Sequence, residues 1–175
     1  MAELILMCGC PGSGKSTYAK SFKTDKDIYI SRDEIRASMI GSNEEYFSRE
    51  TEVFQQFVDE INIALTKAER YVIADATHIS FSSRMKVMSR IKDRSTIVNC
   101  IVMDIPLDIA LERNSHRTGR ECVPEQALKN MYNGLTPPQK GETIDKVVYV
   151  NCESKIIKTE KLGGRLWTVP KFSLW

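Results

Sequence analysis

The chain has 175 residues, with 25 Lys and Arg against 23 Asp and Glu, for a net charge of +2. This length fits one domain over residues 1–175, and the small net charge excludes a strong overall field for nucleic acid, so any polyanion site must be local. There is no apolar run of membrane-spanning length and no signal-peptide pattern, and the five cysteines are odd in number. We therefore expect a cytoplasmic protein without membrane contact, located in the host cytoplasm if a phage encodes it.

Apolar segments alternate with amphipathic segments along the chain. The predicted strands are residues 4–9, 27–31, 71–74, 96–103 and 146–151. The predicted helices are residues 17–22, 33–39, 45–70, 82–92, 107–117 and 124–135. This alternation predicts an α/β fold, a three-layer sandwich with a parallel sheet between helices. Ligands of such sheets bind beyond the carboxyl ends of the strands, so the residues that follow the strands should converge on one cleft.

A glycine-rich stretch that fits the phosphate-binding P-loop follows the first predicted strand. It consists of Gly9, Cys10, Pro11, Gly12, Ser13, Gly14, Lys15, Ser16 and Thr17. The glycines allow a tight turn whose backbone N–H groups point at phosphate oxygens, and the next helix adds the positive end of its dipole. Lys15 is placed for the β- and γ-phosphates, and the Ser16 hydroxyl is placed for Mg²⁺. The stretch predicts a site for ATP, or another nucleoside triphosphate, with Mg²⁺.

A carboxylate and an arginine follow the second predicted strand, within the sequence SRDEIR at residues 31–36. Asp33 can orient an acceptor hydroxyl and take its proton during phosphoryl transfer, and Arg36 can bind a phosphate on the acceptor. Alternatively, Asp33 caps the following helix and Arg36 faces solvent. Asp75, after the third strand, either supports Mg²⁺ or the acceptor loop that contains Thr77, or it caps the next helix.

Three arginines stand near a glycine at the end of the helix predicted over residues 107–117. Arg113 and Arg117 are four residues apart, so we expect them to share a helix face. Both would reach the donor phosphates when a helical lid at about residues 113–123 closes. Arg120 either contributes or faces solvent. The alternative is an ordinary solvated basic face.

The C-terminal extension, at about residues 152–175, differs in character from the rest. Residues 155–161 and 165–169 flank two glycines and predict a weak β-hairpin. Its aromatic residues are Trp167, Phe172 and Trp175. We expect these rings to cover the core or to pack against a second subunit, which leaves a homo-oligomer open.

Four segments together resemble the kinase domain of the bacteriophage 5′-polynucleotide kinases. They are GCPGSGKST at residues 9–17, SRDEIR at 31–36, ADATHIS at 74–80 and RNSHRTGRECVP at 113–124. The resemblance covers roughly the first three quarters of the chain and implies an adenylate-kinase-like P-loop fold. It also implies ATP-dependent phosphorylation of the 5′-hydroxyl of DNA or RNA, with single-stranded ends as substrate, often in end-healing repair.

Carried over by position, the resemblance assigns a role to each matching residue. It implies that Lys15 and Ser16 hold ATP and magnesium, that Asp33 is the general base, that Arg36 binds the acceptor's 3′-phosphate, that Arg113 and Arg117 clamp the donor phosphates, and that Asp75 supports the acceptor loop. Lys15, Asp33 and Arg117 would thus be catalytic. The loop departs from the family at Thr77-His78, where an asparagine-like position is replaced.

Two other functions fit parts of the sequence. A P-loop kinase for a small-molecule hydroxyl on a nucleoside, sugar or antibiotic fits the near-neutral charge, because a polynucleotide binder usually has a larger basic excess. An ATP-dependent switch protein that acts through its aromatic tail would bind ATP but phosphorylate no hydroxyl. Arg36 favours the polynucleotide kinase, because an arginine there makes sense only if the acceptor carries a nearby phosphate.

Overall fold

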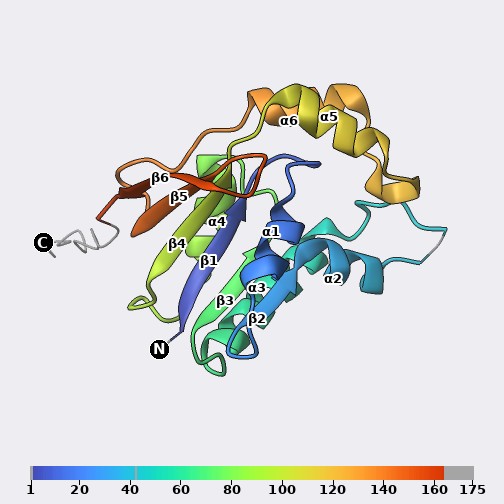
Figure 1. Ribbon diagram of the computed structural model, residues 1–175. Coiled ribbons are helices and arrows are strands. Elements are labelled where there is room, and N and C mark those ends of the chain that lie inside the picture. Colours follow the sequence, from blue (N-terminus) through green and yellow to red (C-terminus); the bar gives the residue numbers. More distant parts are fainter. Residues whose placement is uncertain (1, 42, 164–175) are drawn as a thin grey trace, which may run out of the picture.

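The computed structural model describes residues 2–41 and 43–163, which form a six-stranded sheet with helices on both faces (Figure 1). The strands are β1 (Glu3–Cys8), β2 (Ile28–Ser31), β3 (Tyr71–Asp75), β4 (Val98–Met103), β5 (Lys146–Val150) and β6 (Ile156–Lys161). The helices are α1 (Lys15–Phe22), α2 (Arg32–Met39), α3 (Glu50–Leu65), α4 (Phe81–Met88), α5 (Leu107–Ser115), the short 3-10 helix η1 (Gly119–Glu121) and α6 (Glu125–Asn133).

The strand order is β2-β3-β1-β4-β5-β6, and the first five of these neighbours pair in parallel. This confirms the predicted α/β sandwich, because each parallel crossover passes over a face of the sheet. β6 differs, since it pairs antiparallel with β5. Residues 155–161 therefore form a hairpin with the preceding strand. The other half of the predicted hairpin, at 165–169, and the three tail aromatics lie outside the described residues.

Alternate residues of β1 point to opposite faces of the sheet and enter two different cores. Leu4 and Leu6 pack with the apolar sides of α3 and α4 on one face, whereas Ile5 and Met7 pack with α1 on the other. β1 is buried on both faces, as a central parallel strand should be. A smaller core joins the P-loop residue Cys10 to α5 and α6. These two helices lie beyond the carboxyl ends of the parallel strands (Figure 1).

Three helix ends differ from the sequence prediction for local reasons. The helix predicted over 45–70 is shorter, because residues 44–49 form turns and the Arg49 guanidinium donates to Met39 O (3.0 Å). At its other end, the backbone N–H groups of Glu69 and Arg70 donate to Lys26 O, which turns the chain into β3. α5 ends at Ser115, two residues before the predicted end. None of the helices within residues 2–41 and 43–163 is long and apolar enough to cross a membrane.

Phe57, fully buried on α3, gives a test of the larger core. We expect Phe57→Ala to lower the free energy of unfolding by about 3–5 kcal/mol, because it removes buried apolar surface and leaves a cavity. Ile63 on the same helix is mostly exposed, so Ile63→Ala should change stability by no more than about 0.5 kcal/mol. Urea denaturation of both variants measures the difference, and equal losses would contradict this account of the core.

Candidate active site

The P-loop runs from the end of β1 to the start of α1, as the sequence predicts. Gly12 and Gly14 adopt positive φ angles of 77° and 86°, which favour glycine. A Cβ on Gly12 would also lie only 2.4 Å from Ala110 O on α5, so the loop packs directly against that helix. The backbone N–H groups at the start of α1 face the space above the loop, which is the arrangement that binds phosphate.

Lys15 folds back over the loop. Its ammonium donates to Cys10 O at 3.0 Å, and burial lowers the pKa of this group. The negative charges of Asp75 and Asp33 act in the opposite direction and raise the pKa. Two carboxylates from the acceptor side therefore lie within electrostatic reach of the P-loop lysine.

Asp75 lies at the carboxyl end of β3, between the ends of β1 and β2. It pairs in register with Met7 on one side and Ser31 on the other, and it is nearly fully buried. The Tyr29 hydroxyl donates to Asp75 Oδ2 at 2.6 Å. Burial and this carboxylate raise the pKa of Tyr29, while the Ser16 hydroxyl beside it acts in the opposite direction. Asp75 does not cap α4, because Ser80 is the N-cap of that helix. Asp75 instead lies at the carboxyl end of the sheet, next to the strand that leads into the P-loop.

The structure also decides the alternative for Asp33 and Arg36. Ser31 is the N-cap of α2 and accepts from the Glu34 N–H, so Asp33 is not the cap. The Asp33 side chain is 79% exposed and is open to a ligand. Arg36 does not face solvent either, since only 5% of it is exposed.

Arg36 is held on every side by polar and aromatic groups. Its Nη2 and Nε donate to Glu50 Oε2 at 2.9 and 3.1 Å, and its Nη1 contacts Asp33. The Tyr46 and Phe47 rings lie 4.9 and 5.2 Å from the guanidinium carbon, which is within cation–π range. Burial lowers the pKa of Arg36, but the hydrogen bonds that its guanidinium donates to Tyr46 and Glu50 outweigh this and raise it, so Arg36 is a buried cation with several partners.

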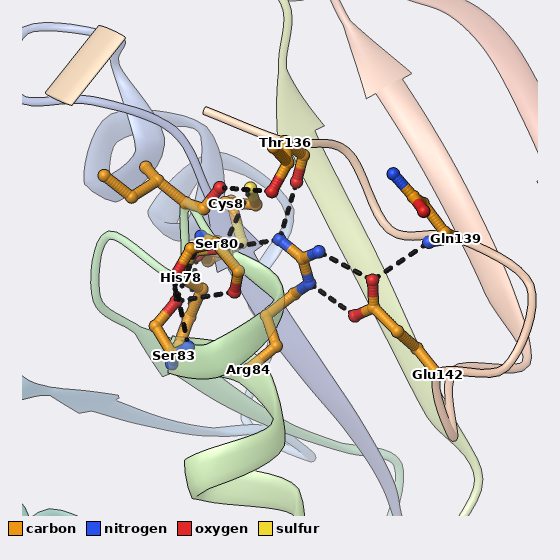
Figure 2. Close-up of polar contacts among 10 residues, drawn as sticks. Cys8, His78, Ser80, Ser83, Arg84, Thr136, Gln139 and Glu142 are labelled. Atoms are coloured by element: carbon orange, nitrogen blue, oxygen red, sulfur yellow. Dashed lines mark hydrogen bonds and ion pairs between the residues drawn. The ribbon is translucent and has the colours of Figure 1, made fainter. Parts of the chain in front are cut away.

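The acceptor loop, residues 76–80, is tied to its surroundings through its own carbonyl groups. Gly9 N–H donates to Thr77 O (2.9 Å), which fastens the loop to the first residue of the P-loop. Figure 2 shows Arg84 of α4 between this loop and the segment after α6. Arg84 Nη1 donates to His78 O and Thr136 O, and its Nε and Nη2 donate to the two carboxylate oxygens of Glu142 at 2.6 and 2.7 Å. Both side chains of this ion pair are fully buried.

His78 occupies an unusual backbone conformation inside the same loop. Its φ is 41°, and its Nδ1 contacts Met7 O at 2.9 Å, which requires a proton on Nδ1. Its Nε2 is buried and has no hydrogen-bond partner among the described residues. Burial lowers the pKa of His78 to about 4, because a second ring proton would find no acceptor. His78 is thus a neutral structural residue that anchors the acceptor loop to β1.

The three arginines in and after the last turn of α5 lie in different surroundings. A Cβ on Gly14 would lie 3.4 Å from Arg113 Nη1, so Arg113 reaches the P-loop, and its Nη2 donates to Cys152 O (3.1 Å). Arg117 does not share its helix face, because α5 has already ended, and this part of the sequence prediction is wrong. Arg120 donates to Gly41 O (3.3 Å) and Glu44 O (2.8 Å). The η1 segment therefore contacts the turn after α2, across the acceptor side.

Most of the predicted site residues lie at the carboxyl end of the sheet. Lys15 and Ser16 begin α1, and Arg113 reaches Gly14. Asp75 ends β3, Asp33 follows β2, and Thr77 O accepts from Gly9 N–H. Arg36 lies behind Asp33 rather than in the open, and Arg117 lies on an exposed segment.

Sequence reasoning missed the partners of these residues. They are Tyr29, Glu50 and Glu142. The sequence indicated such partners only through charge, because an arginine that is buried in a helix requires a carboxylate partner from another part of the chain.

A family described as AAA domain (AAA_33) matches residues 4–138 of the chain. Among curated proteins, an L-seryl-tRNA(Sec) kinase of Methanococcus maripaludis is 30% identical over 145 residues, covering 77% of this chain and 53% of that protein. A protein of Autographa californica nuclear polyhedrosis virus named as a putative bifunctional polynucleotide kinase/RNA ligase is 25% identical, over 74% of this chain and 20% of its own length. The chain thus spans about half of the first relative and a fifth of the second.

Solved structures have the same fold. A chain of the Pnkp1/Rnl/Hen1 RNA repair complex superposes with a TM-score of 0.62 at 23% identity, over 77% of this chain and 44% of that one. At this identity the likeness concerns the fold, which is the six-stranded P-loop arrangement described above.

The buried ion pair predicts a strongly non-additive pair of substitutions. Arg84→Met leaves the Glu142 carboxylate buried without its partner, so we expect a loss of about 3–5 kcal/mol in the free energy of unfolding. Arg84→Met combined with Glu142→Leu removes the orphaned charge and should lose clearly less. Urea denaturation of the single and double variants measures the coupling. A double variant that is as unstable as the sum of both single variants would argue against it.

His78 predicts a pH dependence of stability. The usual pKa of histidine is 6.5, whereas here it is about 4, so between these pH values the unfolded chain binds a proton that the folded chain does not. The free energy of unfolding should therefore fall as the pH falls from 6.5 towards 4, by up to about 1.4 kcal/mol per unit. We expect a shallower curve for His78→Asn, because asparagine tolerates a positive φ but does not titrate. Parallel curves for the two proteins would refute this role.

Proposed function

We propose that this chain, which belongs to the family described as AAA domain (AAA_33), is a polynucleotide kinase that phosphorylates the 5′-hydroxyl of DNA or RNA. It is a nucleotide-binding P-loop kinase of the phosphotransferase type. The finer assignment concerns the acceptor, and it rests on the side chains that face the P-loop.

One observation carries the proposal. Asp75 ends β3, which pairs with the strand that leads into the P-loop, and Asp33 lies in the first turn of α2 directly after β2, the next strand of the sheet. Both carboxylates therefore lie at the same end of the sheet as Lys15. Asp33 is also exposed, as a general base must be if a substrate hydroxyl is to reach it. A carboxylate at this place can orient an acceptor hydroxyl and take its proton during the transfer.

The donor side supplies the positive charge. On ATP binding, Lys15 would leave Cys10 O for the β- and γ-phosphates, which lie over the N–H groups at the start of α1. Arg113 is already beside Gly14 and would bind the same phosphates. The Ser16 hydroxyl and the Asp75 carboxylate would supply oxygen donors that suit Mg²⁺, and the Tyr29 hydroxyl, which donates to Asp75, also lies beside Ser16. When bound, the ion would neutralise charge on the donor phosphates. Arg117 would join them when residues 113–123 close as a lid.

The chemical step is a single in-line transfer. The acceptor's 5′ oxygen forms a bond to the γ-phosphorus while the bond from that phosphorus to the β,γ-bridging oxygen breaks, and ADP leaves. The hydroxyl proton passes to Asp33. Gly9 N–H and Arg84 hold the acceptor loop through its carbonyl groups, so this loop would keep its position when the substrate binds.

The acceptor side favours a phosphate-bearing substrate. Arg36 lies one helical turn after Asp33 and contacts it, so a phosphate bound by Arg36 would lie beside a hydroxyl held by Asp33. The relative named above as a putative bifunctional polynucleotide kinase/RNA ligase supports a nucleic-acid acceptor. The weak overall charge agrees with a site that binds one short end rather than a long duplex.

The first prediction for this function is transfer of labelled γ-phosphate from ATP to a short 5′-hydroxyl oligonucleotide. Asp33→Asn should lower the turnover number by roughly 10²–10⁴, because the general base is removed, while ATP affinity stays close to that of the unmodified chain. A filter assay for transfer and a fluorescent-nucleotide titration measure the two quantities separately.

The 5′-phosphorylated form of the same oligonucleotide and a Lys15→Ala variant serve as controls, and neither should give labelled product. Transfer by Asp33→Asn at the rate of the unmodified chain would remove Asp33 from this role. ATP binding with no label on either strand would overturn the polynucleotide assignment and direct the search to small-molecule hydroxyls.

A further inference from the structure

The carboxylate of Glu50 lies between two arginines of α2. Its Oε2 accepts from Nη2 and Nε of Arg36, and its Oε1 accepts from Nη2 of Arg32. Glu50 is the first residue of α3, so it reaches the pair from a neighbouring helix. One planar anion thus occupies a fork made by two guanidiniums.

This is the arrangement in which proteins bind a phosphate. Two guanidiniums that converge on one oxyanion supply several charged donors in a fixed geometry, and phosphate and carboxylate compete for the same donors. Here the anion belongs to the chain itself. The cluster is neutral as it stands, because Arg32 and Arg36 face the two charges of Glu50 and Asp33.

The members of the cluster differ in their exposure to solvent. Arg36 is 5% exposed, and the Tyr46 and Phe47 rings pack against its guanidinium. Glu50 is 35% exposed and lies at a helix end that follows a run of turns, so its carboxylate has a path into solvent. A phosphate that arrives next to Asp33 therefore meets a carboxylate with access to solvent, in front of the buried guanidinium of Arg36.

We propose that Glu50 is an internal substitute for the phosphate of the acceptor. Its carboxylate occupies the Arg32–Arg36 fork, and it leaves when an acceptor places its own phosphate there. Arg32 is then a second ligand of that phosphate. The exchange makes the site selective, because only an acceptor with a phosphate beside its reactive hydroxyl can replace the contacts that Glu50 makes with Arg32 and Arg36. This inference rests on the proposed function.

A purely structural role of Glu50 makes the opposite prediction. If Glu50 serves only to hold Arg36 in position, its removal disorders the arginine and weakens the binding of a phosphate-bearing acceptor. If Glu50 competes with the phosphate, its removal strengthens that binding. The sign of the effect therefore separates the two roles.

The experiment compares Glu50→Gln with Glu52→Gln. Glutamine keeps the shape of glutamate and removes its charge, and Glu52 is a matched control because it pairs with Arg49 on the exposed side of the same helix turn. Adenosine 3′-monophosphate and adenosine serve as acceptors with and without the phosphate. We expect Glu50→Gln to lower KM for adenosine 3′-monophosphate about tenfold, the order of one competing charge-assisted hydrogen bond. Glu52→Gln should leave this KM unchanged.

A raised or unchanged KM for adenosine 3′-monophosphate in Glu50→Gln overturns the inference, as does an equal fall in KM for adenosine. A direct titration by calorimetry, with adenosine 3′-monophosphate and no ATP, gives a readout that does not need the reaction. If the chain transfers phosphate to no 5′-hydroxyl, the proposed function fails, and this titration still tests the site. Tighter binding by Glu50→Gln than by the unmodified chain supports the internal substitute, and equal or weaker binding refutes it.

Discussion

The end of β1 is the constraint on which the site depends. This strand is buried on both faces and pairs with β3 and β4, so its position is fixed by the whole sheet. At its last residues the backbone holds both substrate-facing loops. Met7 O binds His78, and Gly9 N–H, the first of the P-loop, binds Thr77 O. The donor loop and the acceptor loop therefore share one support and keep a fixed distance from each other.

The second feature of the molecule is the amount of buried charge that surrounds this support. Arg84 and Glu142 are fully buried, and their desolvation is offset by four hydrogen bonds from the guanidinium, two of them to the carboxylate. Such a pair adds little net stability, but its fixed hydrogen-bond geometry joins the two loops at defined atoms. In this chain it fixes the acceptor loop against the segment that follows α6, which apolar packing alone would hold less specifically.

The sequence predicted the parts of the site that are contiguous in the chain. The P-loop could be predicted because nine consecutive residues carry all of its chemistry, and the sheet could be predicted from its apolar strands. The Arg36–Glu50 contact could not, because residues 45–49 were predicted as the first turn of a helix, whereas in the structure they form the turn that brings Glu50 to α2. Arg117 was predicted on the same helix face as Arg113 for a related reason, because no residue next to Ser115 in the sequence marks the end of α5. Arg84 and Glu142 are 58 residues apart, and their pairing follows from tertiary structure alone.

Two of the cations proposed to meet substrate are already bound to oxygen atoms of the chain. Lys15 donates to Cys10 O, and Arg36 donates to Glu50. Folding has therefore removed water from these groups before any ligand arrives, and a phosphate has only to exchange one oxygen partner for another. Such preorganised charges stabilise a developing negative charge more effectively than solvated ones, because no solvent has to reorient during the reaction. The same contacts make the site selective against weak anions, because an incoming group must bind the cation better than a backbone carbonyl or a carboxylate does. A phosphate meets that condition.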